Sequence, residues 1–297
     1  MNRAKTLQLT ALRAGFGARA DALDLREADQ ALLQQVRDAM DQYAVLVFPG
    51  QQFDHQQQLD FAARLDGALH SKTSTAAMQK NRFGNEALTD ISNVGISGEI
   101  LAQDDRRRIN GLANRLWHTD ASFEDPPGRY SMLFARKLPP VRADTEFADM
   151  RAAYDALEPE TQAGLAHYSV RHSIVYSRHV LGFDFSPEES ARLPGAVHPL
   201  VRQFANGRKS LYLASHAERI IELPVSEGRL LLHDLIEHAT RERFVFSHAW
   251  QLGDLVIWDN RCTMHRARPF DDKRYARELT RVTTLDLPRG KPLPEEA

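Results

Sequence analysis

Leu116-Trp117-His118-Thr119-Asp120 is the stretch around which the fold prediction is built, and Trp258-Asp259-Asn260-Arg261-Cys262-Thr263-Met264-His265 is its counterpart far downstream. In an extended strand the side chains alternate between faces, so His118 and Asp120 project to one side, about 7 Å apart along the backbone. A second strand that carries His265 alongside would bring two imidazoles and one carboxylate together.

This set of donors predicts a metal site with one open side. Two histidines and one carboxylate that cap one face of the metal form the facial triad of non-haem Fe(II) oxygenases. A His-x-Asp tripeptide is common, however, and from the pattern alone a surface turn or a structural core histidine remains an equal alternative. Trp117, the several alternating strands of the chain and the Trp258-Asp259-Asn260 segment before His265 favour the metal site.

Composition sets the class of protein. The chain has 297 residues, which is long enough for a sizeable core. Its 38 Lys and Arg residues nearly balance 40 Asp and Glu residues, so no overall charge attracts nucleic acid or an acidic membrane. Cys262 is the single cysteine, which excludes an intrachain disulfide. Mean hydropathy is −0.46, and the N-terminus lacks the apolar core of a signal peptide, so we expect a cytoplasmic protein.

Strand and helix signals alternate along the chain. Apolar runs bounded by Pro or Gly predict strands, and apolar residues at three- and four-residue steps predict helices. The predicted strands are 7–12, 44–48, 88–94, 130–135, 144–149, 169–176, 210–214, 244–246, 255–258 and 279–285. The predicted helices are 26–43, one capped by Asp54, 150–157, 160–166, and one capped by Ser226 that ends near 240. We expect one domain, 1–297, mainly β with flanking helices, and a surface excursion at 183–199.

Residues 68–87 lose all periodicity and are rich in polar side chains. A loop of this length inside a compact domain is typical of a lid or binding loop, with disorder without function as the alternative. Lys72 and Lys80 could offer positive charge to a substrate there, or simply be solvated. The mixed charge run 104–108 predicts a solvated face rather than a phosphate site.

Two arginines share a face of the last predicted strand. Arg277 and Arg281 lie about 13 Å apart along an extended backbone, together with Thr283. Unless this face meets water, each guanidinium needs an anion, and its planar fork suits a carboxylate. A solvent-facing edge strand is the alternative. Thr145 adds a hydroxyl on a strand that could face the same carboxylate.

These segments resemble the TauD/TfdA family of Fe(II)- and 2-oxoglutarate-dependent dioxygenases, and within it the 2,4-dichlorophenoxyacetate dioxygenase branch. The matching segments run in the expected order: Leu88–Val94, Leu116–Phe123, Arg129–Leu133, Asp144–Leu157, Gly253–Cys262 and Arg277–Leu279. The resemblance implies a double-stranded β-helix, a jelly-roll core whose mouth holds the iron. Arg142-Ala143 departs from the family's Gly-Gly before Asp-Thr, and the turn between His265 and Arg277 is one residue longer.

The resemblance also implies roles for individual residues. His118, Asp120 and His265 would be the Fe(II) ligands, and Arg277 with Thr145 would hold the distal carboxylate of the cosubstrate 2-oxoglutarate. The predicted contacts to the substrate are Arg281, Asn114, Lys72 and His216. With O2, 2-oxoglutarate would be converted to succinate and CO2 while a substrate C–H is hydroxylated.

An anionic organic substrate is favoured, most simply an aryloxyacetate such as 2,4-dichlorophenoxyacetate. Hydroxylation beside its ether oxygen gives a hemiacetal that collapses to a phenol and glyoxylate. The alternatives are an alkyl sulfonate such as taurine, a sulfate ester or another aromatic acid. A jelly-roll binding protein without turnover and a zinc hydrolase are further alternatives, and the latter gives Arg277 and Thr145 no role. We expect a homo-oligomer with no nucleic-acid or membrane partner.

Overall fold

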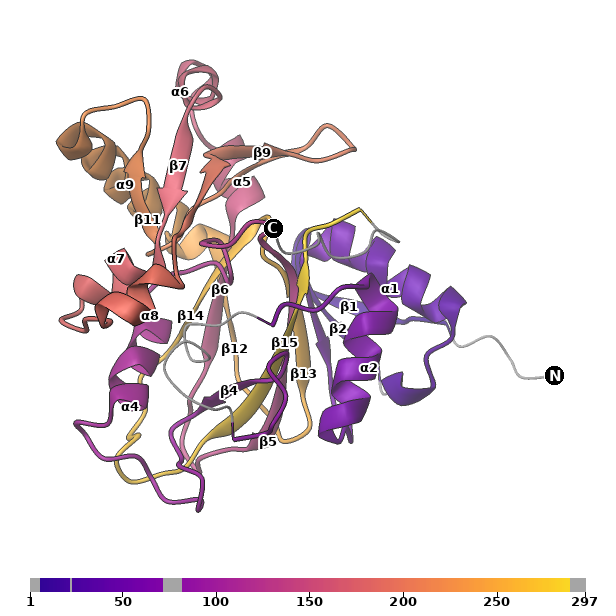
Figure 1. Cartoon of the computed structure of the whole chain (residues 1–297). Helices are drawn as coiled ribbons and strands as arrows, with labels where there is room; N and C mark the ends of the chain where they lie inside the picture. Colours follow the sequence, from indigo (N-terminus) through magenta and orange to yellow (C-terminus); the bar gives the residue numbers. More distant parts are fainter. Residues whose placement is uncertain (1–5, 22, 72–81, 289–297) are drawn as a thin grey trace.

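The fold is a jelly-roll core with helices on its flanks (Figure 1). The computed structural model describes residues 6–21, 23–71 and 82–288. A seven-stranded sheet has the order β1-β2-β3-β13-β5-β15-β4, and a three-stranded sheet has the order β12-β6-β14. Aromatic side chains join the two sheets. The ring centroids of Phe147 in β6 and Trp258 in β13 are 5.5 Å apart. The predicted fold class is confirmed.

The strands of the large sheet are β1 (Leu9–Arg13), β2 (Phe16–Ala20), β3 (Val45–Phe48), β4 (Thr89–Ser92), β5 (Gly128–Lys137), β13 (Leu255–Asp259) and β15 (Glu278–Leu285). Those of the small sheet are β6 (Thr145–Asp149), β12 (Val245–His248) and β14 (Thr263–Ala267). Outside this core lie β7 (Ser169–His172), β8 (Ala196–Pro199), β9 (Val201–Gln203), β10 (Lys209–Leu211) and β11 (Ala217–Ile220). Strand β13 pairs with β5 at all five of its residues and with β3 at four of them, and all five are buried.

The helices are α1 (Gln30–Tyr43), α2 (His55–Asp66), α4 (Arg106–Gly111), α5 (Met150–Asp155), α6 (Pro159–Leu165), α7 (Ile174–His179), α8 (Pro187–Ala191) and α9 (Val225–Ala239), and the short 3₁₀ turns are η1 (Leu25–Glu27), η2 (Leu112–Arg115) and η3 (Glu242–Phe244).

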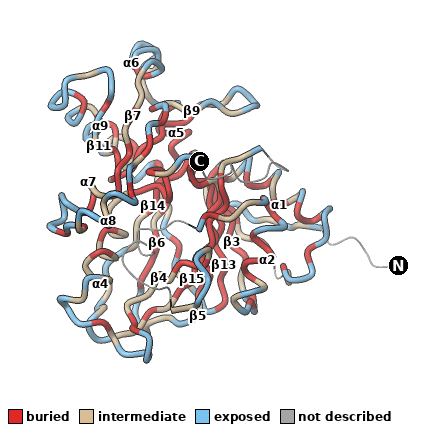
Figure 2. Tube along the Cα trace, in the orientation of Figure 1, coloured by how far each residue is buried: buried red, intermediate tan, exposed pale blue. Residues whose placement is uncertain are grey.

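Helices α1 and α2 cover one face of the large sheet (Figure 1). Asp54 caps α2 as predicted, and Gln57 completes a capping box with it. The apolar faces of both helices pack on β3, β5 and β13 in one buried cluster. Figure 2 shows the buried residues gathered in the sheets and on the inner sides of the helices. The core therefore holds the central strands rigidly from one side.

Three local predictions were wrong. Residues 169–176 do not form one strand, because Ser173 accepts a hydrogen bond from the Tyr176 amide, ends β7 and caps α7. The segment 183–199 is not a surface excursion, since it contains α8 and β8 and buries three apolar side chains against Phe123 and Ile174: Phe183, Phe185 and Leu193. Ser226 does not cap α9, which begins one residue earlier after Pro224 without a side-chain cap.

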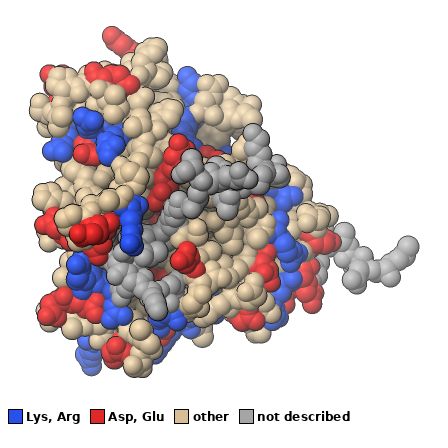
Figure 3. All heavy atoms as spheres, in the orientation of Figure 1, with Lys and Arg blue, Asp and Glu red and all other residues tan. Residues whose placement is uncertain are grey.

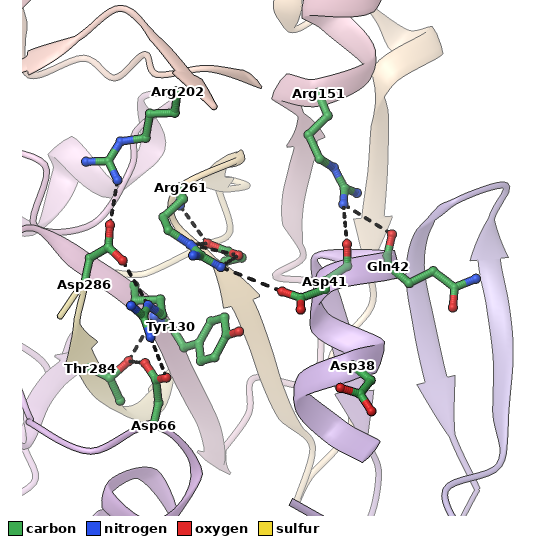
Figure 4. A network of polar contacts seen from close by, with 12 residues as sticks. Asp38, Asp41, Gln42, Asp66, Tyr130, Arg151, Arg202, Arg261, Thr284 and Asp286 are labelled. Atoms are coloured by element: carbon green, nitrogen blue, oxygen red, sulfur yellow. Dashed lines mark hydrogen bonds and ion pairs between the residues drawn. The ribbon is translucent and has the colours of Figure 1, made fainter. Parts of the chain in front are cut away.

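A polar network closes the end of β15 that lies away from Arg277 (Figure 4). Asp286 accepts hydrogen bonds from Arg129 and Arg202, at 2.9 and 2.7 Å. Arg129 also reaches Asp66 at the end of α2, at 2.9 Å. The network thus ties α2, β5, β15 and β9 together at the far end of the barrel.

Among the described residues, no helix combines the length and the apolar character that a membrane crossing needs. Basic and acidic side chains are interspersed on the face drawn in Figure 3. This mixture agrees with the near-neutral composition.

Candidate active site

The three predicted ligands converge inside the barrel. His118 and His265 form an isolated antiparallel bridge, with their backbone amides donating to each other's carbonyls at 3.0 and 2.9 Å. Ligand atoms of His118, Asp120 and His265 all lie within 4.8 Å of one another, and all three side chains are buried. One detail differs from the strand assumption: Asp120 lies in a turn directly after the bridge, and Ala121 has a φ of 52°.

Asn260 positions the turn that carries Asp120. Its Oδ1 accepts hydrogen bonds from the Asp120 amide at 3.1 Å and from Trp258 Nε1 at 3.0 Å. Its Nδ2 donates to Ser131 Oγ at 2.9 Å, and that hydroxyl donates to Asp120 Oδ2 at 2.8 Å. The carboxylate is therefore oriented by strands β5 and β13, which the helices hold in place.

Both imidazoles are kept neutral, and that of His118 is also oriented. His118 Nδ1 donates to the Leu116 carbonyl at 2.8 Å, which leaves Nε2 as the free lone pair. Burial lowers the pKa of His118 and lowers that of His265 well below its usual value. For Asp120, burial would raise the pKa, but the charge of Arg281, with smaller contributions that include the Ser131 hydrogen bond, lowers it to about 2. Two neutral imidazoles and an ionised carboxylate are the protonation states that a divalent metal requires.

Arg281 of β15 and Arg277, the residue directly before this strand, both line the cavities beside the triad, and β15 lies between β5 and β4. The alternative of a solvent-facing edge strand is therefore wrong. Arg281 Nη1 donates to Asp120 Oδ1. Arg277 is different, since its Nε and Nη2 are buried without a hydrogen-bond partner in the described part of the chain. Burial lowers the pKa of Arg277 to about 10.

Arg277 and Thr145 line one small cavity of about 30 Å³ beside the triad. Thr145 Oγ1 accepts a hydrogen bond from Trp250 Nε1 at 3.0 Å, so its own hydrogen remains available to donate. The guanidinium carbon of Arg277 lies 5.9 Å from the centre of the Trp250 ring. An unpaired buried guanidinium and a hydroxyl donor together fit a carboxylate.

A larger cavity of about 220 Å³ also reaches the triad and shares His118, Arg277 and Arg281 with the small one. Three residues predicted to bind substrate, Asn114, His216 and Arg281, line it. Its apolar wall consists of Ile91, Val94, Ile96, Leu101, Leu112, Phe123, Ile174 and Phe270. Lys72 and Lys80 lie outside the described residues. The charge run 104–108 is not simply a solvated face, because Arg107 and Arg108 line this cavity and Arg108 pairs with Asp272 at 3.1 Å.

The comparisons with known proteins agree with this geometry. Residues 6–283 match the family described as "Taurine catabolism dioxygenase TauD, TfdA family". The chain belongs to the TauD/TfdA family. It is 44% identical to the alpha-ketoglutarate-dependent 2,4-dichlorophenoxyacetate dioxygenase of Cupriavidus pinatubonensis, over 91% of this chain and 95% of the relative. It is 34% identical to the (S)-phenoxypropionate/alpha-ketoglutarate-dioxygenase of Delftia acidovorans, over 98% of both chains.

A solved structure of AAD-2 in complex with Mn(II) and N-oxalylglycine superposes with a TM-score of 0.89. It is 42% identical and covers 95% of this chain and 98% of its own. This TauD/TfdA protein is accordingly an Fe(II)- and 2-oxoglutarate-dependent dioxygenase that acts on a small molecule. The donor set of the triad fits Fe(II), and the unpaired guanidinium of Arg277 fits a second carboxylate nearby.

The sequence-based prediction missed several residues that shape the site of this TauD/TfdA enzyme. Asn260 and Ser131 were not singled out, although both lie in segments that match the family. Arg178 of α7 also lines the larger cavity. No sequence signal pointed to it, because it lies between the predicted strand 169–176 and the predicted surface excursion 183–199, where a single arginine suggests a solvated side chain.

Proposed function

We propose that this enzyme hydroxylates an aryloxyacetate such as 2,4-dichlorophenoxyacetate at the carbon beside the ether oxygen. The reaction consumes 2-oxoglutarate and O2 and yields succinate, CO2 and a hemiacetal, which collapses to a phenol and glyoxylate. The observation that carries the proposal is a cavity beside the triad with an apolar wall and arginine side chains, because an aryloxyacetate has an aromatic body and one carboxylate. The 44% identity to 2,4-dichlorophenoxyacetate dioxygenases supports it.

In this proposal His118, Asp120 and His265 hold Fe(II), while Thr145 and Arg277 hold the distal carboxylate of 2-oxoglutarate. Arg281, Asn114, His216 and Lys72 are proposed contacts to the substrate. The iron with 2-oxoglutarate supplies the oxidising chemistry. The protein's part is to place one C–H of the substrate next to the metal and to keep competing water away from it.

Different side chains orient the metal ligands and the substrate. His118 reaches the triad with its proton fixed on Nδ1, so its ligating nitrogen needs no proton release. Ser131 and Asn260 restrict rotation of the Asp120 carboxylate. The apolar wall would bury an aromatic ring, and a ring in a preformed pocket fixes the position of its carboxylate and of the carbon between them.

A substrate panel tests the proposal. Purified enzyme with Fe(II), 2-oxoglutarate and O2 is given phenoxyacetates, taurine, an alkyl sulfate ester and benzoic acids, and succinate is measured above the substrate-free background. We expect phenoxyacetates to give the highest kcat/KM, with one phenol released for each succinate. Taurine or a sulfate ester turned over in preference to every phenoxyacetate would refute the substrate assignment and favour the sulfonate or sulfate alternative.

An anaerobic titration tests the residue assignments separately from turnover. Adding Fe(II) and then 2-oxoglutarate should produce a visible chelate absorption band, which an accepted substrate acid should perturb. His118→Ala should abolish the band while the circular dichroism spectrum stays native. An unchanged band in this variant would remove His118 from the metal site.

We further propose that residues 1–297 form a single domain, with the segment 68–87 acting as a lid, and that the protein is a cytoplasmic homo-oligomer without a nucleic-acid or membrane partner. Limited proteolysis tests the first point, since a single domain should resist cleavage everywhere except in the proposed lid. Light scattering coupled to gel filtration tests the second, and a mass of one chain would contradict it.

A further inference from the structure

The arginines that line the larger cavity differ in how their charge is balanced. Eight arginines line it, and six of them have an acidic partner. The six pairs are Arg82 with Asp90, Arg107 with Asp105, Arg108 and Arg115 with Asp272, Arg268 with Glu146, and Arg281 with Asp120. Within the described ranges, Arg178 and Arg277 have no acidic partner. An unpaired buried charge is costly, so both positions are expected to meet an anion in the working enzyme.

Among the described residues, Arg178 donates hydrogen bonds only to neutral groups. Its Nε donates to Asn110 Oδ1 at 2.9 Å, and its Nη1 donates to Ser177 Oγ at 3.1 Å. The residue is only 6% exposed, and no described residue accepts a hydrogen bond from its Nη2. Burial and the charge of Arg281 lower the pKa of Arg178 and Asp120 opposes them, which leaves a pKa of about 10. The guanidinium is thus held in position but not neutralised.

Ser177 links His216 to Arg178. Ser177 Oγ donates to the Ile174 carbonyl at 2.9 Å, so it can only accept from its two other partners. One of these is His216 Nδ1 at 2.9 Å, which must therefore carry a proton directed at Ser177. The Nδ1–H of His216 is thus already used, whereas Arg178 beside it has an Nη2 that no described residue accepts from.

We propose that Arg178 binds the carboxylate of the organic substrate and so determines the preference of the enzyme for anionic substrates. The inference rests on the proposed function, and it adds Arg178 to the contact already proposed for Arg281. Arg178 lines the same cavity as His118 and Asp120, so a substrate bound in this cavity can meet both the guanidinium and the triad.

The experiment compares wild type, Arg178→Gln, Arg178→Lys and the control Arg171→Gln. Arg171 of β7 is not among the residues that line the cavity, and its side chain is 36% exposed and paired with Glu218 at 3.0 Å. Removing a charged hydrogen bond typically costs about 2 kcal/mol, which corresponds to about 30-fold in KM for 2,4-dichlorophenoxyacetate. We expect this rise in Arg178→Gln, partial recovery in Arg178→Lys, and less than about threefold change in Arg171→Gln.

Two further readouts separate binding from a merely structural role. The KM for 2-oxoglutarate and the anaerobic chelate band should be the same in all four proteins. The neutral amide of the same acid should bind wild type and Arg178→Gln equally weakly, so the variant loses the preference for the acid over the amide. An unchanged preference, or an equal loss of acid and amide binding, would overturn the inference.

The outcomes also separate this inference from the proposed function. If wild type turns over phenoxyacetates and Arg178→Gln has an unchanged KM, the function stands and the inference fails. If wild type turns over none of them, anaerobic binding of 2,4-dichlorophenoxyacetate to the Fe(II) and 2-oxoglutarate complex decides the point. Binding that requires Arg178 would support the inference while the function fails, and no binding by wild type would refute both.

Discussion

Asn260 Oδ1 lies 3.1 Å from the backbone nitrogen of Asp120, and this hydrogen bond joins the end of β13 to the turn that carries the triad carboxylate. The same side chain donates to Ser131 Oγ, which holds the carboxylate itself. A residue without chemistry of its own therefore determines where Asp120 can point.

Asn260→Leu should weaken metal binding without removing a ligand. Loss of such supporting hydrogen bonds typically costs about 10- to 100-fold in metal affinity. The variant leaves Trp258 Nε1 and the Asp120 amide without their shared acceptor, so its free energy of unfolding should also fall by about 2 kcal/mol or more. Competition with a chelator measures the affinity. An affinity equal to that of wild type would show that Ser131 and Arg281 hold Asp120 without Asn260.

Arg277→Met should improve stability and damage cosubstrate binding. Its buried guanidinium has unpaired nitrogens, and replacing an uncompensated charge by an apolar side chain is stabilising in many proteins. We expect a higher melting temperature without 2-oxoglutarate, and a KM for 2-oxoglutarate raised by about 30-fold or more. Thermal melts with and without the cosubstrate measure both effects. A lower melting temperature in the absence of cosubstrate would contradict the idea of an uncompensated charge.

Thr145→Val keeps the shape of the side chain but removes its hydroxyl. The variant loses one donor to the proposed cosubstrate carboxylate and leaves Trp250 Nε1 without its acceptor. We expect a KM for 2-oxoglutarate higher by about 3- to 10-fold and a free energy of unfolding lower by about 1 kcal/mol. Thr145→Ser is the matched control and should restore both quantities. Failure of serine to restore the KM would assign the effect to packing.

Metal affinity should depend little on pH between 7.5 and 6.0. Burial lowers the pKa of His118 and of His265, so the folded protein keeps both imidazoles neutral below their ordinary pKa. Two imidazoles with an unshifted pKa near 6.5 would weaken binding by about 14-fold over this range, whereas we expect less than about threefold. Binding of Mn(II), followed by electron paramagnetic resonance, measures this. The same shifts predict that the metal-free protein loses stability as the pH falls below about 6.5, because unfolding then takes up protons.

Asp286→Asn should reduce stability at neutral pH and much less in acid. Burial would raise the pKa of Asp286, but the charges of Arg261, Arg202 and Arg129 lower it overall. Its contribution is therefore present above its ordinary pKa of about 3.9 and is lost as the pH falls below that value. We expect a loss of about 3 kcal/mol at pH 7, measured by urea unfolding, because two arginines lose their shared carboxylate. An equal loss at pH 7 and pH 3.5 would show that charge is not the cause.

The sequence predicted which three side chains come together better than it predicted the local backbone that presents them. His118, Asp120 and His265 could be found because the chemistry of a metal site restricts the residue types and because a strand pairing brings distant segments together. The spacing did not reveal that Asp120 lies in a turn, since a strand and a bridge followed by a turn can both bring two side chains to one metal.

The parts that were missed depend on packing rather than on spacing. The segment from Ser169 is rich in β-branched residues and predicts a strand, but Ser173 caps a helix there, a local hydrogen bond that outweighs the propensity. Arg178 lies in that helix, and its importance follows only from the absence of an acidic partner among its described neighbours. No pattern along one chain can show that a charge is unpaired.

The small sheet also fixes the distance between His265 and Thr145. In the register of β6 and β14, His265 pairs with Phe147 and Ala267 pairs with Thr145, so the ligand and the hydroxyl are separated by two ladder positions, about 7 Å. If the iron is bound at His265 and the distal carboxylate of the cosubstrate at Thr145, the cosubstrate must span this fixed distance. A four-carbon oxo diacid would then fall short of Thr145 and a six-carbon one would overrun it, so the backbone ladder would select the five-carbon cosubstrate by its span.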